Sequence, residues 1–139
     1  VVLPNIILKG INTSDIDLRN ELEYKKPIIL SFLSAECSHC KFQAEDIYNN
    51  SDLFRNVNHI VIVEMHDSLD LFLYKTKLEI GKEYKLTSAN FDVIDLFDIK
   101  GFPSTLIFDS DGAFIKEIAG EMKVEKLTLK IEECLNQDL

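Results

Sequence analysis

Two short hydrophobic runs along the chain predict strands that are buried on both faces. The first, Pro27 to Ser34 (PIILSFLS), is bounded by a proline and a polar cluster. The second, His59 to Met65 (HIVIVEM), is dense in β-branched residues, which favour strands. Unbroken apolar runs of this length are typical of strands covered by helices on both sides. A further strand is predicted at Leu3 to Leu8, followed by a polar connection to Pro27.

Helical periodicity begins directly after the first run. From Ser38 onward, Cys40, Ala44 and Ile47 recur on one face of a predicted amphipathic helix. A second amphipathic helix is predicted near the end of the chain. Its apolar stripe consists of Val124, Leu127, Ile131, Cys134 and Leu135.

The region between these helices is less regular. Ser68 to Ile80 combines helical spacing with a stretch of alternating leucines, and we predict a helix there. Asn90 is a suitable N-cap for a short helix from Phe91 to Phe97.

A hairpin is predicted next. Thr105 to Asp109 and Ala113 to Ala119 form its strands, and Ser110-Asp111-Gly112 forms the tight turn. Buried strands separated by helices predict an α/β fold with parallel strand pairs, and the hairpin makes the sheet mixed. The length of 139 residues fits one domain spanning residues 1–139.

Composition narrows the classes of function. The chain has 15 Lys and Arg against 24 Asp and Glu, a formal net charge of -9, which disfavours nucleic-acid partners and anionic membrane surfaces. No apolar run reaches the ~18–20 residues of a membrane span. The first residues, Val1 to Pro4, lack the features of a signal peptide. Three cysteines are too few for a disulfide scaffold. We expect an acidic monomer whose chemistry depends on local motifs.

The strongest local motif is Cys37-Ser38-His39-Cys40, placed where the first buried strand gives way to a helix. Two cysteines three residues apart in a first helical turn are close enough to form a disulfide. The unpaired N–H groups and the dipole of the helix N-terminus stabilise a thiolate at Cys37. Cys40 faces the core one turn later and is expected to react second. This arrangement predicts thiol–disulfide exchange, with Cys37 as the nucleophile and Cys40 as the resolving thiol.

Two neighbouring side chains are candidates for tuning this redox pair. His39, when protonated, adds positive charge near the Cys37 sulfur and so favours the reduced form and a more oxidising couple. Glu36, directly before the motif, acts in the opposite direction. An exposed His39 without a tuning role is the alternative.

A metal site is the other use of paired cysteines. Zinc needs four ligands, and the candidates beyond the pair are His39, His59, His66 and Cys134. Copper(I) also suits thiolate and imidazole ligands. No second C-x-x-C or H-x-x-x-H motif supports either metal, so we expect none, and we expect Cys134 to be a buried small hydrophobic residue.

The segment PIILSFLSAECSHC, followed about sixty residues later by GFPSTLIFDSDG, resembles the thioredoxin superfamily. The long insert before Phe91 is most similar to its TlpA/ResA branch. The resemblance covers about Leu3 to Leu135. It implies a central mixed β-sheet flanked by helices on both faces. It further implies that Pro103 is a cis-proline opposite the cysteine pair, and that the Phe102 backbone binds the substrate peptide.

The chain departs from this family at the residues that accept a proton from the second cysteine. Ser31 stands where thioredoxins have a buried acid, and Gln43 stands where TlpA/ResA relatives often have a glutamate. Glu45 and Glu64 are the alternative carboxylates. The Ser38-His39 pair inside the motif, resembling that of DsbA-type oxidases, leaves the redox direction open.

These observations predict a thiol–disulfide oxidoreductase without a bound cofactor. Its partners would be protein thiols and disulfides together with an upstream redox protein, and reduction or interchange is favoured over net oxidation. The resemblance implies the periplasm or cell envelope of a bacterium, and the cytoplasm is the alternative. Other interpretations are an oxidase or isomerase tuned by His39, or a thioredoxin-like binding module that holds a metal or docks a protein. A peroxidase is disfavoured, because the residue three before each cysteine of the pair is not the Thr that peroxiredoxins have.

Overall fold

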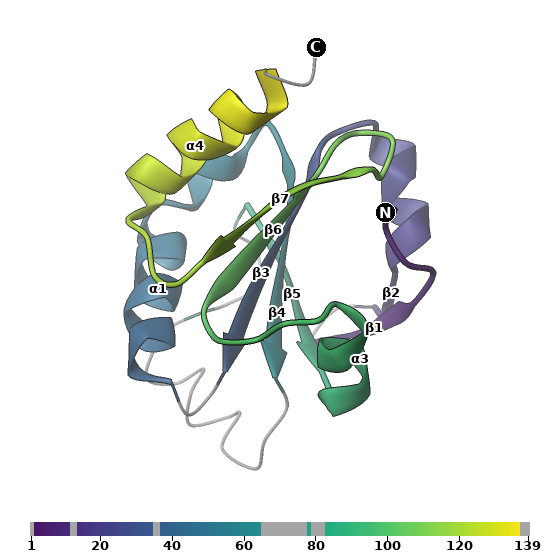
Figure 1. The fold of residues 1–139 in the computed structure, drawn as a ribbon, viewed down its shortest axis with the longest axis horizontal. Coiled ribbons are helices and arrows are strands. Elements are labelled where there is room, and N and C mark those ends of the chain that lie inside the picture. Colours follow the sequence, from purple (N-terminus) through teal and green to yellow (C-terminus); the bar gives the residue numbers. More distant parts are fainter. Residues whose placement is uncertain (1, 12–13, 35–36, 65–77, 79–82, 137–139) are drawn as a thin grey trace.

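A mixed sheet forms the centre of the computed structural model, which describes all residues except 1, 12–13, 35–36, 65–77, 79–82 and 137–139. In its described part, seven strands lie in the order β2-β1-β5-β4-β3-β6-β7 (Figure 1). They are β1 (Ile7–Gly10), β2 (Ile16–Asp17), β3 (Ile28–Ser34), β4 (Asn58–Glu64), β5 (Lys85–Ala89), β6 (Ser104–Phe108) and β7 (Phe114–Ala119). Strands β3, β4 and β5 are parallel, whereas β6 is antiparallel to β3 and to β7. The predicted mixed sheet is therefore confirmed.

Helices cover both faces of this sheet. One face carries α1 (Ser38–Asn49) and α4 (Val124–Asn136), and the other carries the 3₁₀ helix η1 (Leu18–Tyr24) and α3 (Phe91–Leu96), as Figure 1 shows. A second 3₁₀ helix, η2 (Ser51–Phe54), follows α1. None of the helices in the described part of the chain combines the length and the apolar character that a bilayer span requires.

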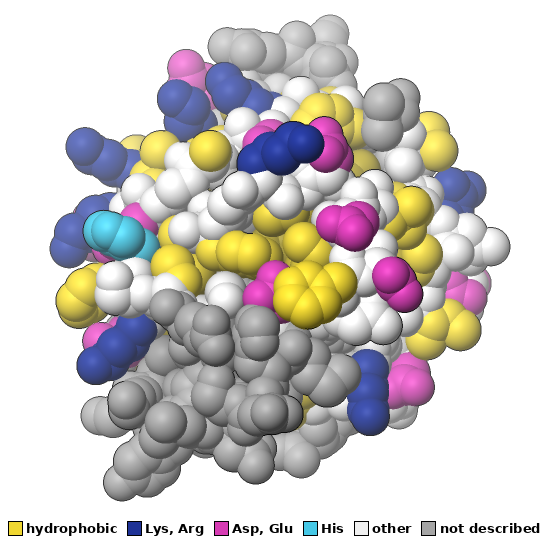
Figure 2. Space-filling model, turned by 60° about the horizontal axis from the view of Figure 1, so that its bottom comes forward, with side chains coloured by type: hydrophobic (Ala, Val, Ile, Leu, Met, Phe, Trp, Pro, Cys, Tyr) yellow, Lys and Arg dark blue, Asp and Glu magenta, His cyan; other side chains and the backbone are white. Residues whose placement is uncertain are grey.

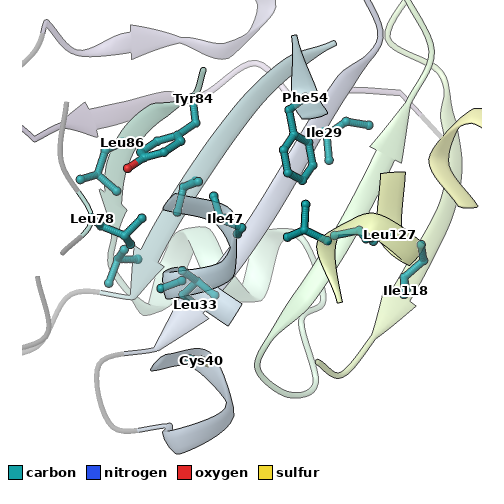
Figure 3. Packing of buried hydrophobic residues seen from close by; sticks show 14 of the residues in the cluster. Ile29, Leu33, Cys40, Ile47, Phe54, Leu78, Tyr84, Leu86, Ile118 and Leu127 are labelled. Atoms are coloured by element: carbon teal, nitrogen blue, oxygen red, sulfur yellow. The ribbon is translucent and has the colours of Figure 1, made fainter. Parts of the chain in front are cut away.

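Every residue of strands β3 and β4, which lie side by side in the sheet, is buried. This is because a separate hydrophobic core packs against each face of the sheet. Ile29 and Leu33 of β3 point toward α1, whereas Leu30 and Phe32 point toward η1 and α3. Figure 3 shows the first of these clusters, in which Cys40 and Ile47 from α1, Leu33 and Ile29 from β3 and Leu127 from α4 converge. Burying such side chains contributes about 1.5–3 kcal/mol each.

Several sequence expectations need correction. The first strand is Ile7–Gly10 rather than Leu3 to Leu8, although Leu3 and Leu8 are buried. The expected polar connection contains β2 and η1. The strand Lys85–Ala89 was not predicted, because Thr87 and Ser88 look polar but are buried, and the Thr87 hydroxyl donates to the Val61 carbonyl at 3.0 Å.

The remaining predicted elements are borne out where they can be compared. The helix at Phe91 begins after Asn90, whose side chain accepts the Val93 N–H at 3.2 Å. The hairpin strands pair as expected. The helix predicted at Ser68 to Ile80 lies outside the described residues except for Leu78, which is buried.

A buried histidine lies in the core between the sheet and α1. The His59 ring stacks on Phe54 with centroids 3.9 Å apart, and its Nε2 lies 2.7 Å from the Ser31 hydroxyl. Its Nδ1 atom is buried and has no hydrogen-bond partner among the residues that the structure describes. Burial disfavours the charged ring and lowers the pKa of His59 to about 3.

This histidine predicts a pH-dependent stability. The unfolded chain binds a proton at His59 below about pH 6.5, whereas the folded protein does so only near pH 3. The free energy of unfolding should therefore fall on acidification, by up to about 1.4 kcal/mol per pH unit from this one group. Chemical denaturation between pH 7.5 and pH 5 measures the slope, which His59→Gln should reduce. His39→Gln, which replaces an exposed histidine, is the control, and equal slopes in wild type and His59→Gln would contradict this account.

Candidate active site

The Cys37 sulfur lies at the N-terminus of α1. Cys37 is the N-cap of this helix, with extended backbone angles (φ −106°, ψ 119°), and its Sγ accepts the N–H of Cys40 at 3.3 Å. The residue is half-buried. A cap acceptor at this position faces the positive end of the helix dipole, which favours negative charge on the sulfur. The geometry therefore provides the anion-stabilising environment that the spacing predicted.

Cys40 lies one turn further on and is fully buried. The Ser34 N–H donates to its sulfur at 3.4 Å. Burial raises the pKa of the Cys40 thiol far above the ordinary range; the contact with Cys37 and the charge of Glu64 raise it further, whereas the Ser34 hydrogen bond lowers it. No disulfide joins Cys37 and Cys40 in this structure. One thiol is thus accessible and the other is shielded behind it.

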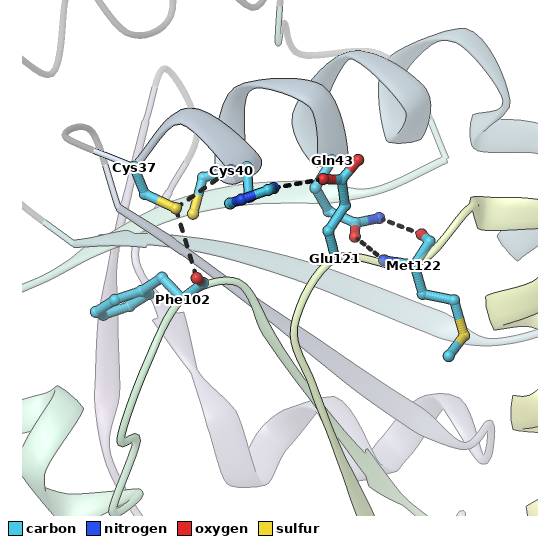
Figure 4. A network of polar contacts seen from close by, with 7 residues as sticks. Cys37, Cys40, Gln43, Phe102, Glu121 and Met122 are labelled. Carbon is cyan, nitrogen blue, oxygen red and sulfur yellow. Dashed lines mark hydrogen bonds and ion pairs between the residues drawn. The ribbon is translucent and has the colours of Figure 1, made fainter.

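The Phe102–Pro103 peptide bond lies against the cysteine pair. It is cis, as the resemblance predicts, and the Phe102 carbonyl lies 3.5 Å from the Cys37 sulfur (Figure 4). Phe102 is half-buried and Pro103 is buried. The Pro103 carbonyl in turn accepts the Gly120 N–H at 2.9 Å, which ties this turn to the end of β7.

Of the two residues predicted to tune the redox pair, Glu36 and His39, the structure describes only His39. Glu36 lies outside the described residues. His39 is exposed, and its Nδ1 lies 2.9 Å from a carboxylate oxygen of Glu121. The sequence analysis missed Glu121, which is 82 positions away, and no local pattern points to it.

Gln43 has a structural role that its sequence position did not suggest. It is buried on α1, its Nε2 donates to the Met122 carbonyl at 3.1 Å, and its Oε1 accepts the Met122 N–H at 2.9 Å (Figure 4). One turn further along α1, Asp46 Oδ2 accepts the N–H of Val124, the first residue of α4, at 2.7 Å. Side chains of α1 therefore hold the segment between β7 and α4 in place.

Of the two alternative carboxylates, Glu64 lies near the buried thiol. It ends β4 opposite Ser34, is nearly fully buried, and accepts the Ser34 hydroxyl at 3.5 Å. Its charge acts on Cys40. Glu45 is half-buried on α1.

The metal candidates do not converge in the described part of the chain. No group of three potential ligands occurs among those residues, and His66 lies outside them. His59 is enclosed in the core. Cys134 is half-buried on α4 rather than buried, because it lies at the edge of the apolar stripe near the helix end.

Figure 2 shows the end of the molecule that lies at the bottom of Figure 1, where α1 begins. Hydrophobic side chains gather at the centre of this face, with Asp and Glu side chains next to them. In the part of the chain that the structure describes, the exposed aromatic side chains include Phe91 of α3, at 64% of its full exposure, and Phe42 of α1, at 56%.

Comparisons with known proteins place this fold. Residues 15–134 match the family model of the thioredoxin-like domain. Among solved structures, a secreted Mycobacterium tuberculosis disulfide oxidoreductase homologous to E. coli DsbE superimposes with a TM-score of 0.74 at 16% identity, covering 93% of this chain and 96% of that one. A putative thiol:disulfide interchange protein DsbE from Chlorobium tepidum gives 0.77 at 17% identity, covering 96% and 95%. StoA from Bacillus subtilis gives 0.73 at 18% identity, covering 91% and 98%.

At these identities the structural matches establish the fold, and a search of curated protein sequences finds no match. The family match spans most of the chain and includes the cysteine pair, the cis-proline and the adjacent strands β3 and β6. The chain therefore belongs to the thioredoxin-like family.

Proposed function

We propose that this protein is a thiol–disulfide oxidoreductase that exchanges disulfides with partner proteins. The observation that carries the proposal is the pairing of an accessible sulfur at a helix N-terminus with a fully buried one in the same helical turn. The Cys37 thiolate attacks a substrate disulfide, forms a mixed disulfide and releases one substrate thiolate. Cys40 then attacks the Cys37 sulfur and releases the second substrate thiol. Two electrons pass from the cysteine pair to the substrate.

Phe102 and Pro103 are proposed to bind the substrate chain. The Phe102 carbonyl lies 3.5 Å from the attacking sulfur, so an extended peptide that pairs with the Phe102 backbone would bring its disulfide next to Cys37. Hydrophobic side chains gather at the centre of the face shown in Figure 2, where α1 begins, and they support binding of an apolar segment of the substrate.

Glu64 is proposed as the proton acceptor for Cys40. The family's usual acidic positions are occupied by Ser31 and Gln43, which cannot take a proton from a thiol as a carboxylate does. Glu64 is buried near this sulfur, and Ser34 contacts both groups through its backbone N–H and its hydroxyl. A proton leaving Cys40 would pass to Glu64 directly or through the Ser34 hydroxyl.

We propose that reduction or interchange, rather than net oxidation, is the physiological direction, with His39 and Glu36 tuning the potential in opposite senses. The similar oxidoreductase from Mycobacterium tuberculosis is described as secreted, which supports a place outside the cytoplasm, in the periplasm or cell envelope. An upstream redox protein would then return electrons to the pair, and the protein would act as a monomer.

The first prediction separates the roles of the two cysteines. Cys37→Ser should reduce catalysed disulfide reduction to background, because it removes the attacking thiolate. Cys40→Ser should stop after one step and accumulate a mixed disulfide with a model disulfide peptide, detected by mass spectrometry. Cys134→Ser is the matched control and should retain turnover. Full turnover in Cys37→Ser would contradict the proposed function.

A second prediction tests the role of Glu64. Resolution of a preformed Cys37 mixed disulfide should slow by at least about tenfold at pH 7 in Glu64→Gln, since a positioned base commonly contributes 10²–10⁴-fold. The direction in which the rate changes distinguishes a proton-accepting Glu64 from a purely electrostatic one. The charge of Glu64 raises the pKa of Cys40, so a purely electrostatic Glu64 would give faster resolution when neutralised. Glu45→Gln removes a carboxylate from α1 as the control, and stopped-flow measurement of released thiol gives both rates.

A third prediction concerns the direction of electron flow. Titration in glutathione and dithiothreitol buffers should give a potential near the ~-270 mV of thioredoxin if the protein is a reductant. A value above roughly -180 mV would instead indicate an oxidase or isomerase dominated by His39.

A further inference from the structure

The histidine inside the redox motif is held by a carboxylate from the other end of the chain. His39 Nδ1 lies 2.9 Å from Glu121 Oε1, in the segment that links β7 to α4 (Figure 4). An ionised carboxylate can only accept hydrogen bonds, so the Nδ1 of His39 carries the hydrogen of this contact. The pair becomes an ion pair whenever the ring carries its second proton.

Exposed ion pairs are usually worth little, because two long side chains must be ordered to make them. Here the backbone beside the carboxylate is already fixed. Gln43 accepts the N–H of Met122, the residue after Glu121, and donates to its carbonyl. Asp46 accepts the N–H of Val124 two residues further on. The segment that carries Glu121 is therefore bound to the same helix that carries the cysteines.

The charge of Glu121 opposes that of His39. A protonated imidazole next to the motif stabilises the Cys37 thiolate, which exists only in the reduced protein, and so makes the couple more oxidising. A carboxylate in contact with that ring places a negative charge beside the positive one at the same end of α1. The charged pair is then close to neutral, so it stabilises the thiolate less than an unpaired imidazolium does, and the couple becomes more reducing.

We propose that Glu121, held by the Gln43 contacts, is a positioning residue that keeps His39 from making the couple oxidising. This inference rests on the proposed thiol–disulfide exchange and goes beyond it, because it explains how a histidine inside the motif is compatible with a reductant. The other charged groups along α1 and the segment between β7 and α4 are Lys41 and Lys123, both exposed, and Glu45 and Asp46, both half-buried.

The test compares reduction potentials of the full chain at pH 7 in glutathione buffers. Glu121→Gln keeps the size of the side chain and removes its charge. Glu125→Gln is the matched control, because it makes the same change at an exposed position in the first turn of α4. We expect Glu121→Gln to shift the equilibrium with glutathione about threefold toward the reduced protein, ~14 mV more oxidising. The control Glu125→Gln should shift the reduction potential by less than half as much. Glu121→Asp keeps the negative charge, so its reduction potential should be closer to that of the wild type than the potential of Glu121→Gln is.

If the wild-type protein has a reversible couple, and Glu121→Gln and Glu125→Gln shift its reduction potential equally, this inference is overturned and the proposed function stays intact. A shift of Glu121→Gln toward a more reducing value would also overturn it. A wild-type protein without any reversible couple would overturn the proposed function and this inference together.

Discussion

The burial of the Cys40 sulfur is the constraint on which the rest of the site depends. Cys40 shares its face of α1 with Ala44 and Ile47, and all three are enclosed by the sheet. The helix is therefore fixed about its own axis, since turning it would expose these side chains to water. With Cys40 inside, Cys37 must lie at the helix N-terminus near the surface, and the parallel pairing of β3 and β4 brings Ser34 and Glu64 together beneath it.

The polar contacts of α1 have a complementary effect. Gln43 and Asp46 bind the backbone that leads into α4. Helices α1 and α4 are therefore joined by these hydrogen bonds as well as by the hydrophobic core that they share. This attachment gives a structural role to the buried Gln43, which stands where the resemblance to the TlpA/ResA branch implies a glutamate. Its amide can donate to one backbone group and accept from the other at the same time, which a carboxylate cannot do. In the proposed mechanism, Glu64 on the neighbouring strand β4 supplies the carboxylate.

The elements that the sequence predicted correctly have strong local signals. Strands β3 and β4 are largely apolar runs, α1 and α4 carry apolar residues every three or four positions, and the hairpin and α3 follow from a turn and an N-cap. Strand β5 escaped prediction because Thr87 and Ser88 find their partners in the neighbouring strands and in the core, not in local sequence. The shift of β1 has a similar cause, since its pairing with β5, at Lys9 and Gly10, sets its position.

Local sequence is sufficient to predict the Cys37–Cys40 pair and the helix that carries it. The spacing of Cys37 and Cys40, after an apolar strand and at the start of an amphipathic helix, is local information, because helix geometry places residues three apart on neighbouring turns. Tertiary structure alone decided which groups surround that pair. Phe102 and Glu121 lie in connecting segments and Glu64 lies at the end of β4. The contacts that join these three residues to α1 and β3 span 65, 82 and 30 positions, respectively. No periodicity encodes such separations; they arise because the sheet order and the packing of α4 on α1 bring distant segments to one end of the molecule.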